Sequence, residues 1–451
     1  MPTTDMFGYE ISLDDKAALS SWNSLVFAFL AHSAETPVHL EALFKRLPDA
    51  PMGHVMKGFF CLLLGRRELV ETAAATAAKV TGLRQIGALN ERESLYADAL
   101  NAWLSGRPTL SAELMDRILA RWPADAVALK LGHGIRFILG DSKGMLTSIE
   151  AVQNTYGTDH PAFGYVQGCR AFALEECGRQ TEAEQAGILA LQHARDDAWG
   201  LHAVAHVYDM TGRADTGVTW LSSQPEAWQH CNNFGYHVWW HLALFHLDRR
   251  EFDVVLDLYD RHVRKDQSDD YRDISNGASM LMRLELEGVD VGNRWEEMAA
   301  ISEGRTEDGC VVFADLHYLL ALMGGDRTDS AKTLVNRIRR DAVRHQTDMD
   351  QVAHTPGIAA AIGIQAFMDG DNASAFTHLK TAYGSMQRIG GSHAQRDVFD
   401  RLTIEAAIRS GQIEDANRLL EDRVNRRGGE DGYTRTRASF IAQLGRVEAT
   451  A

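Results

Sequence analysis

The stretch LHAVAHVYDMTGRADTGVTWLSS (201–223) contains two helical patterns joined by a short turn. His202, His206 and Asp209 follow one another at spacings of four and three, which places their side chains on one face of a helix. Gly212 comes next, and glycine suits the left-handed conformation that often ends a helix. A second helical pattern, RADTGVTWLSS, follows the turn. The stretch therefore predicts a helical hairpin.

The same kind of turn recurs along the chain, where an apolar helical stretch ends in glycine or aspartate beside charged residues. The turn positions are Gly65, Gly106, Gly140, Gly178, Gly212, Asp248, Gly288, Gly324, Gly370 and Gly411. Neighbouring turns lie 34 to 46 residues apart, and each interval holds two helical patterns. This repeat is typical of an α-solenoid of tetratricopeptide type. We therefore predict an all-α superhelix of about ten degenerate helical hairpins.

The predicted hairpins follow one another without a linker rich in proline or serine. The sequence therefore favours one helical-repeat domain over residues 21–443. Residues 1–20 and the tail 444–451 are expected to be irregular, as chain ends often are.

Composition narrows the class of protein. Only nine of the 451 residues are proline, which suits long uninterrupted helices. The net charge is −16 and no block of basic residues occurs, so nucleic acid and anionic membrane are poor candidate partners. The five cysteines form no CxxC motif, which favours a reducing compartment. With no signal peptide visible and no long apolar run, we expect a soluble cytoplasmic protein.

Seven histidines share a register relative to the turns. His133, His206, His241 and His317 lie six or seven residues before their turn, and His54, His202 and His237 lie ten or eleven before theirs. In tetratricopeptide solenoids the first helix of each hairpin lines the concave surface, so we expect these imidazoles to point into a shared interior. A repeat can also copy a structural histidine that has no chemical role, and the register alone does not separate the two interpretations.

Two histidine pairs stand out because each has a spacing of four and they occur in consecutive hairpins. His202 and His206 form the first pair, and His237 and His241 form the second. Two such pairs on neighbouring helices are a common way to build an imidazole metal site. We predict that these four residues bind one divalent transition metal ion, with zinc as the first candidate. The first pair lacks the internal glutamate of HExxH, so that protease mechanism is not supported.

Several strings resemble the tetratricopeptide repeat protein 38 family, in the same order along the chain. They are PMGHVMKG (51–58), ALKLGHG (128–134), HAVAH (202–206) with the following DM, HVWWH (237–241), SMLMRLELEGVDVGNRW (279–295), DLHYLLA (315–321) and GGSHAQRDVF (390–399). The resemblance implies a tetratricopeptide-like helical fold and a soluble protein, and it implies no particular reaction. His393 departs from the asparagine expected at its position.

By position, the resemblance carries over a set of candidate site residues. They are His54, His133, His202, His206, His237, His241, Asp315, His317, Gln395, Arg396 and Asp397. We expect substrate contacts from five side chains, namely His54, His133, Trp240, Gln395 and Asp397. Trp240 also suits a packing role. The Arg396–Asp397 pair can equally pin the last hairpins together.

Two functions compete. The first is a metal-assisted hydrolase that acts on a small molecule, in which a metal-bound water is the nucleophile. Asp209 or Asp315 would orient an imidazole or accept a proton, His317 would join the catalytic set, and Arg396 would hold an acidic substrate. The second is an interaction scaffold that binds a peptide in the solenoid groove. The sequence leaves the oligomeric state open between a monomer and a homo-oligomer.

Overall fold

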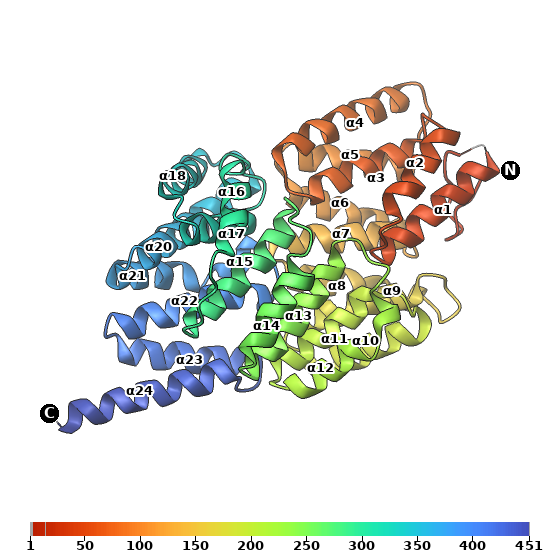
Figure 1. The fold of residues 1–451 in the computed structure, drawn as a ribbon. Coiled ribbons are helices and arrows are strands. Elements are labelled where there is room, and N and C mark those ends of the chain that lie inside the picture. The colour runs from red at the N-terminus through yellow and green to blue at the C-terminus, as the bar shows by residue number, and fades with distance from the viewer. Residues whose placement is uncertain (1–2, 14, 451) are drawn as a thin grey trace. The chain divides into compact units, whose positions relative to one another are not determined.

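The structure is a computed structural model that describes residues 3–13 and 15–450, with side chains up to residue 443. Helices dominate this part of the chain (Figure 1), which contains no β-strand and only two isolated bridges, Thr4 with Glu10 and Ser33 with Cys231. The predicted all-α helical-repeat fold is confirmed. Among the same residues, no helix is both long enough and apolar enough to cross a membrane.

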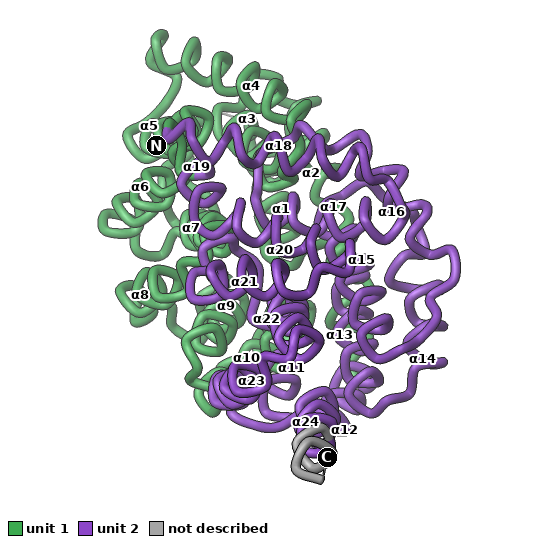
Figure 2. The backbone as a smooth tube through the Cα atoms, turned by 90° about the vertical axis from the view of Figure 1, so that its left-hand side faces the viewer, with its two compact units in different colours: residues 1–204, 224–235, 346–348 green, residues 205–223, 236–345, 349–451 purple. Residues whose placement is uncertain are grey.

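The chain groups into two compact units, shown in Figure 2. Unit 1 comprises residues 1–204, 224–235 and 346–348, and unit 2 comprises residues 205–223, 236–345 and 349–451. Three helices begin in unit 1 and end in unit 2. They are α11 (Ala198–Met210) and, by their first one or two residues, α13 (Phe234–Asp248) and α19 (Asp348–Val352). The predicted single domain over residues 21–443 stays a prediction.

Unit 1 is a series of helices that pack against their neighbours along the chain. They are α1 (Lys16–Leu30), α2 (Thr36–Arg46), α3 (Pro51–Leu63), α4 (Arg67–Gln85), α5 (Glu91–Leu104), α6 (Pro108–Arg121), α7 (Ala126–Leu139), α8 (Ser142–Val152), α9 (Phe163–Glu176) and α10 (Gln180–His193), with the short 3-10 helices at Gln153–Thr155 and Pro225–Ala227. The start of α11 completes the unit.

Unit 2 continues the same pattern. Its helices are α12 (Ala214–Ser222), α13 (Phe234–Asp248), α14 (Phe252–Leu258), α15 (Tyr271–Leu286), α16 (Trp295–Glu303), α17 (Val312–Gly324), α18 (Thr328–Arg344), α19 (Asp348–Val352), α20 (Ile358–Met368), α21 (Asn372–Tyr383), α22 (His393–Arg409), α23 (Ile413–Arg427) and α24 (Gly432–Thr450). Short π-helical turns span Tyr259–Val263 and Ala353–Gly357, and a 3-10 turn spans Met386–Ile389.

Each predicted turn joins two helices of one hairpin. Eight of the ten predicted turn residues adopt a positive φ, as the sequence predicts for glycine at a helix end. At the other two turns, the left-handed residue lies two positions later, at Arg250 (φ 60°) and Asp326 (φ 58°). Gly324 is required for a different reason: a Cβ atom there would lie 2.4 Å from the Trp295 ring.

The chain ends differ from the prediction. Helix α1 begins at Lys16, inside the segment predicted to be irregular, because Asp15 caps it by accepting the N–H groups of Ala17 and Ala18. Helix α24 continues to Thr450 through the predicted tail, whose sequence AQLGRVEA (442–449) is rich in helix-forming residues. The longest turn-to-turn interval, from Gly324 to Gly370, contains the additional short helix α19.

The two helices of a hairpin have different burial. The first helix is buried on nearly all sides, as in α17, where the residues from Val312 through Leu322 are all buried. The second helix buries one face, as in α18, where Ala331, Leu334 and Ile338 face the core at helical spacing. Polar side chains on the first helices are therefore placed in the interior, where they need partners.

Candidate metal site in the histidine cluster

Two helices supply the histidine cluster. Asp197 directly precedes helix α11, and its carboxylate accepts the N–H of Gly200 at 3.1 Å. The helix carries His202 and His206 one turn apart. Helix α13 carries His237 and His241 at the same spacing. Because each pair occupies one face of its helix, the four imidazoles can meet where the two helices run side by side.

The ring nitrogens come together as predicted. Within unit 2, the Nε2 atoms of His237 and His241 are 3.2 Å apart, and the ring centroids of His206 and His241 are 4.4 Å apart. His202 lies one turn earlier on α11, and one ligand nitrogen from each of the four histidines lies within 4.8 Å of the others. The predicted cluster of His202, His206, His237 and His241 is confirmed as a group that could hold a metal ion.

The spacing suits a tetrahedral ion. Zinc bonds imidazole nitrogens at about 2.0–2.1 Å, which in a tetrahedral site separates neighbouring ligand nitrogens by about 3.3–3.4 Å. The 3.2 Å between His237 and His241 is close to that value, whereas other pairs in the cluster, up to 4.8 Å apart, would have to close slightly around an ion. The same 3.2 Å also suits a hydrogen bond between two neutral imidazoles.

Burial keeps His237 and His241 neutral. His241 and His206 are completely inaccessible to solvent, and His202 is 2% exposed. Desolvation lowers the pKa of His237 to about 3 and that of His241 well below its ordinary value, and the neighbouring histidines and Arg283 contribute to the lowered pKa of His241. Neutral imidazole is the form that binds a metal ion, so these two ligands need no deprotonation at neutral pH.

Two residues fix the orientation of His237. Asn276 on α15 places its Oδ1 atom 2.9 Å from Nδ1 of His237, and the Trp240 ring stacks on His237 at 5.2 Å with an interplanar angle of 16°. Trp240 is completely buried and packs against the cluster, and its contact with substrate stays a prediction. With Nδ1 bound to Asn276, Nε2 is the nitrogen that faces the cluster.

The two predicted acid–base residues are engaged elsewhere. Asp209 accepts hydrogen bonds from Arg427, through its backbone oxygen at 2.6 Å and through Oδ1 at 3.1 Å. Asp315 is 1% exposed and forms an ion pair with Arg337, which also binds Asp341 at 2.9 Å. Both carboxylates balance buried arginines, so the structure gives them a structural role in place of the predicted orientation of a ligating imidazole.

His317 lies outside the cluster. Its Nδ1 lies 2.7 Å from the backbone oxygen of Phe313, and its ring contacts Phe313 and Phe399 at centroid distances of 4.3 and 5.1 Å. Desolvation lowers its pKa to about 3, which leaves the imidazole neutral. The predicted catalytic role for His317 therefore has no support from its surroundings.

The loop before α22 is held by hydrogen bonds from its own side chains. Arg396 donates to the backbone oxygens of Gly390 and Gly391, and its Nη2 lies 3.3 Å from Nδ1 of His393. Ser392 and Gln395 form a capping box in which each side chain bonds the other residue's backbone N–H. Both side chains complete the start of the helix, and the predicted substrate contacts of Arg396 and Gln395 stay predictions.

Asp397 belongs to a buried network of charges in unit 2. Its carboxylate accepts from Arg401 at 2.7 Å and from Arg423 at 2.6 Å, and these arginines hold its pKa far below the ordinary value despite burial. Arg423 also binds Asp431 at 2.6 Å. Two arginines occupy this carboxylate, which fits the alternative that it pins the last hairpins together. Its predicted contact with substrate stays a prediction.

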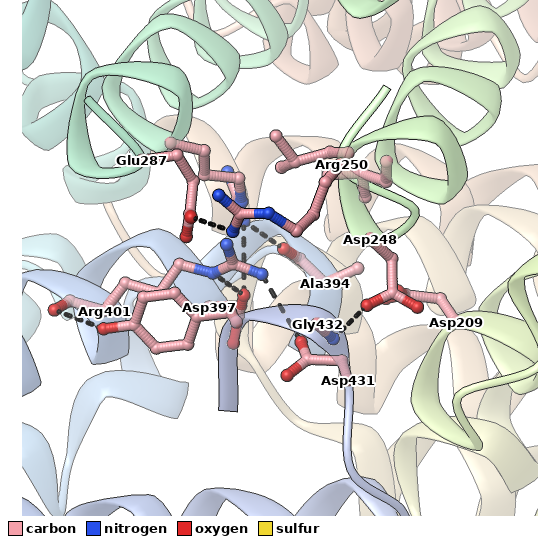
Figure 3. A pocket seen from close by; sticks show the side chains of 13 residues that line it. Asp209, Asp248, Arg250, Glu287, Ala394, Asp397, Arg401, Asp431 and Gly432 are labelled. Carbon is pink, nitrogen blue, oxygen red and sulfur yellow. Dashed lines mark hydrogen bonds and ion pairs between the residues drawn. The ribbon is translucent and has the colours of Figure 1, made fainter. Parts of the chain in front are cut away.

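A small cavity lies inside this network (Figure 3). Its walls include Asp209, Asp248, Arg283, Asp397 and Arg401, and its volume is about 20 Å³. A cavity of about that volume holds a water molecule. It is too small for the substrate of a small-molecule hydrolase.

The remaining candidates lie in unit 1. His54 is half-buried, places Nε2 2.8 Å from the backbone oxygen of Pro48, and contacts the Phe44 ring. His133 is 3% exposed and its Nε2 accepts the indole N–H of Trp199 at 3.2 Å. Each has a structural partner of its own, and no substrate role is visible for either. The predicted interior shared by all seven histidines stays a prediction, because these residues divide between the two units.

Two important neighbours of the cluster were not predicted. Asn276 and Arg283 lie on α15, and Arg283 is fully buried with its guanidinium 5.5 Å from the Trp240 ring. Asn276 lies twelve residues before Gly288, one residue away from the register of His54 and His237. A search for any polar residue within one position of that register, not only for histidine, would have found it.

Comparison with known proteins adds little. No family model matches the sequence. Among solved structures, the chain is similar to one described as "Structure of Naa15/Naa10 bound to HypK-THB", with 11% identity and a TM-score of 0.24. The match covers 94% of this chain and 65% of that one, so the chain spans less than two thirds of the protein it matches. At this level of similarity, the fold assignment rests on the helices of the chain itself.

Proposed function

We propose that this helical-repeat protein binds a divalent transition metal ion, with zinc as the first candidate, at His206, His237 and His241 together with His202. The observation that carries the proposal is the 3.2 Å between the Nε2 atoms of His237 and His241, in a group whose ligand nitrogens all lie within 4.8 Å. Burial keeps His237 and His241 neutral, as metal ligands must be.

The donor set favours zinc without selecting it uniquely. Imidazole also suits copper, nickel and iron, and the order of affinities places copper above zinc. Four nitrogen donors on two helices favour a closed tetrahedral site, which is typical of structural zinc. An ion there would join α11 to α13, so we propose a structural role for it.

A hydrolytic role stays a proposal with less support. It requires a coordination position open to water, a base and a residue that binds the substrate. The predicted residues for these tasks, Asp209, Asp315 and Arg396, are all bound to partners in the fold. A hydrolase built on this cluster would need other residues as the base and for binding the substrate.

The second function that we propose is a scaffold that binds a peptide or protein segment, as helical-repeat folds often do. The observation that favours it over hydrolysis is the engagement of the predicted catalytic side chains in ion pairs and helix caps. A displayed peptide library selected on the metal-loaded protein should enrich a shared motif, and selection without enrichment would count against a scaffold. Membership of the tetratricopeptide repeat protein 38 family, which its ordered strings suggest, is likewise a proposal.

Elemental analysis tests the metal proposal directly. Protein purified without chelator or a histidine tag should carry close to one transition metal ion per chain. His206→Ala and His241→Ala should lose that ion. His246→Ala, on the same helix as His241, should retain it, because His246 pairs with Glu251 outside the cluster. Equal metal content in all four proteins, or none in the parent protein under zinc supplementation, would overturn the proposal.

A further inference from the structure

Asn276 contacts the cluster from a third helix. It lies on α15, is 1% exposed, and places Oδ1 2.9 Å from Nδ1 of His237. The Nδ2 atom of the same amide is buried and forms no hydrogen bond within the described part of the chain. A buried donor without a partner costs about 1–3 kcal/mol. The orientation that places Oδ1 against His237 therefore carries this cost at Nδ2.

The orientation of the amide determines the tautomer of His237. An amide oxygen accepts a hydrogen bond, so Nδ1 of His237 must carry the proton and Nε2 must carry the lone pair. If the amide were reversed, its NH₂ group would donate to Nδ1, and the ring proton would move to Nε2. That proton would occupy the Nε2 lone pair through which His237 would bind a metal ion.

The two tautomers give the histidine pair different properties. With a proton on Nε2 of His237, the 3.2 Å contact to His241 is a hydrogen bond that closes the site. With the lone pair on Nε2, His237 can bind a metal ion once Nε2 of His241 also presents a lone pair. Metal-bound histidines usually donate their second ring N–H to an oxygen acceptor, which fixes the tautomer and the ring orientation.

We propose that Asn276 is a positioning residue that holds His237 in the Nδ1–H tautomer and so makes the His237–His241 pair a metal-binding pair. This inference rests on the proposed metal site. The residue acts through His237 and touches neither the ion nor a substrate. It adds no negative charge, so the charge of the ion is not compensated from this position.

The charged residues near the site bear on what a substitution of Asn276 should do. Arg283, two turns after Asn276 on α15, donates to the backbone oxygens of Ser279 at 3.0 Å and Ala394 at 2.7 Å. Its closest carboxylate is Asp397 at 3.9 Å, which is already bound by Arg401 and Arg423. A carboxylate at position 276 would place a negative charge beside a ligand of the ion, and it would accept the Nδ1 proton more strongly than an amide does.

Three variants test the inference through zinc affinity, measured against a competing chelator at fixed pH. Asn276→Leu removes the acceptor and should weaken zinc binding by about 10–100-fold, whereas Asn276→Asp should bind at least as tightly as the parent protein. Ser279→Ala is the matched control, because Ser279 is a buried residue one turn away whose hydroxyl donates to the backbone oxygen of Asn276 and not to its amide. It should leave the affinity unchanged.

A second measurement separates this inference from the metal proposal. Nitrogen-15 NMR of the metal-free protein reports which ring nitrogen of His237 carries the proton. We expect the Nδ1–H form in the parent protein and in Asn276→Asp, and a shift toward Nε2–H in Asn276→Leu. An Nε2–H form in the parent protein, or equal zinc affinity for Asn276→Leu, would overturn the role of Asn276. Absence of zinc binding by a parent protein with the Nδ1–H form would overturn the metal proposal alone.

Discussion

Zinc should raise the thermal unfolding midpoint of this protein, and His241→Ala should remove that effect. An ion that binds only the folded state stabilises it by an amount set by its concentration relative to its dissociation constant. The four ligands occupy two helices that no disulfide joins, since all five cysteines are free. The unfolded chain therefore has no preformed site, and nearly all the binding energy should favour the folded state.

The size of the shift follows from the amount of chain that unfolds. Free zinc at a hundred times its dissociation constant contributes about 2.7 kcal/mol. Unfolding entropy is about 2.1 cal/mol/K per residue, or roughly 0.5 kcal/mol/K for the roughly 230 residues of unit 2. The midpoint should then rise by about 5–6 °C if unit 2 unfolds separately, and by about 3 °C if the whole chain unfolds together.

The assay is differential scanning calorimetry with and without buffered zinc. His241→Ala lowers the midpoint by itself, because it leaves a cavity at a fully buried position. The informative quantity is therefore the difference between the two conditions for each protein. His246→Ala should shift as much as the parent protein. A zinc-induced shift that survives in His241→Ala would show that the ion binds elsewhere and would refute the assignment of the site.

Two further predictions concern stability without metal. His237 and His317 have pKa values of about 3 in the folded state and about 6.5 when unfolded, so the unfolded chain binds protons that the folded chain does not as the pH falls below 6.5. Urea unfolding should show a loss of about 1.4 kcal/mol per pH unit for each of these histidines between pH 6 and 4, and a flat profile would contradict their burial as neutral groups. Asp397→Asn should cost about 3–5 kcal/mol by the same measurement, since it leaves Arg401 and Arg423 facing a neutral amide, and an unchanged free energy of unfolding would contradict the network.

The repeat could be predicted from the sequence because each hairpin has a recognisable residue at its turn. Left-handed glycine at a helix end is a local requirement, and eight of the ten positions satisfy it. The two exceptions shift by two residues, to Arg250 and Asp326, which no local pattern distinguishes from ordinary charged residues. The histidine cluster was also predictable, because a spacing of four within a helix and the adjacency of consecutive hairpins are both properties of the repeat.

The partners of the cluster depend on contacts that a repeat does not encode. Asn276 comes from a third hairpin, and its amide meets His237 only once α15 has packed beside α13. Arg337, which pairs with Asp315, lies 22 residues further along the chain, and Arg423, which pairs with Asp397, lies 26 residues further along. These distant pairs form because an ionised group buried without a counter-charge is costly, so each buried carboxylate needs a cationic partner.

Asp209 shows why a shared helical face is not sufficient to place a residue in a site. Three residues after His206 it lies on the same face, but about 4.5 Å further along the axis, at 1.5 Å per residue. At that level Arg427, from the end of α23, reaches its carboxylate and its backbone oxygen, and the carboxylate forms part of the wall of the water-sized cavity. The helix therefore carries two layers of different chemistry: a neutral imidazole layer that suits a metal ion, and a charged layer one turn later that ties the last hairpins together. The helical period, which is visible in the sequence, determines the face of the helix on which a side chain lies. The position along the helix axis determines which neighbouring helix supplies its partner.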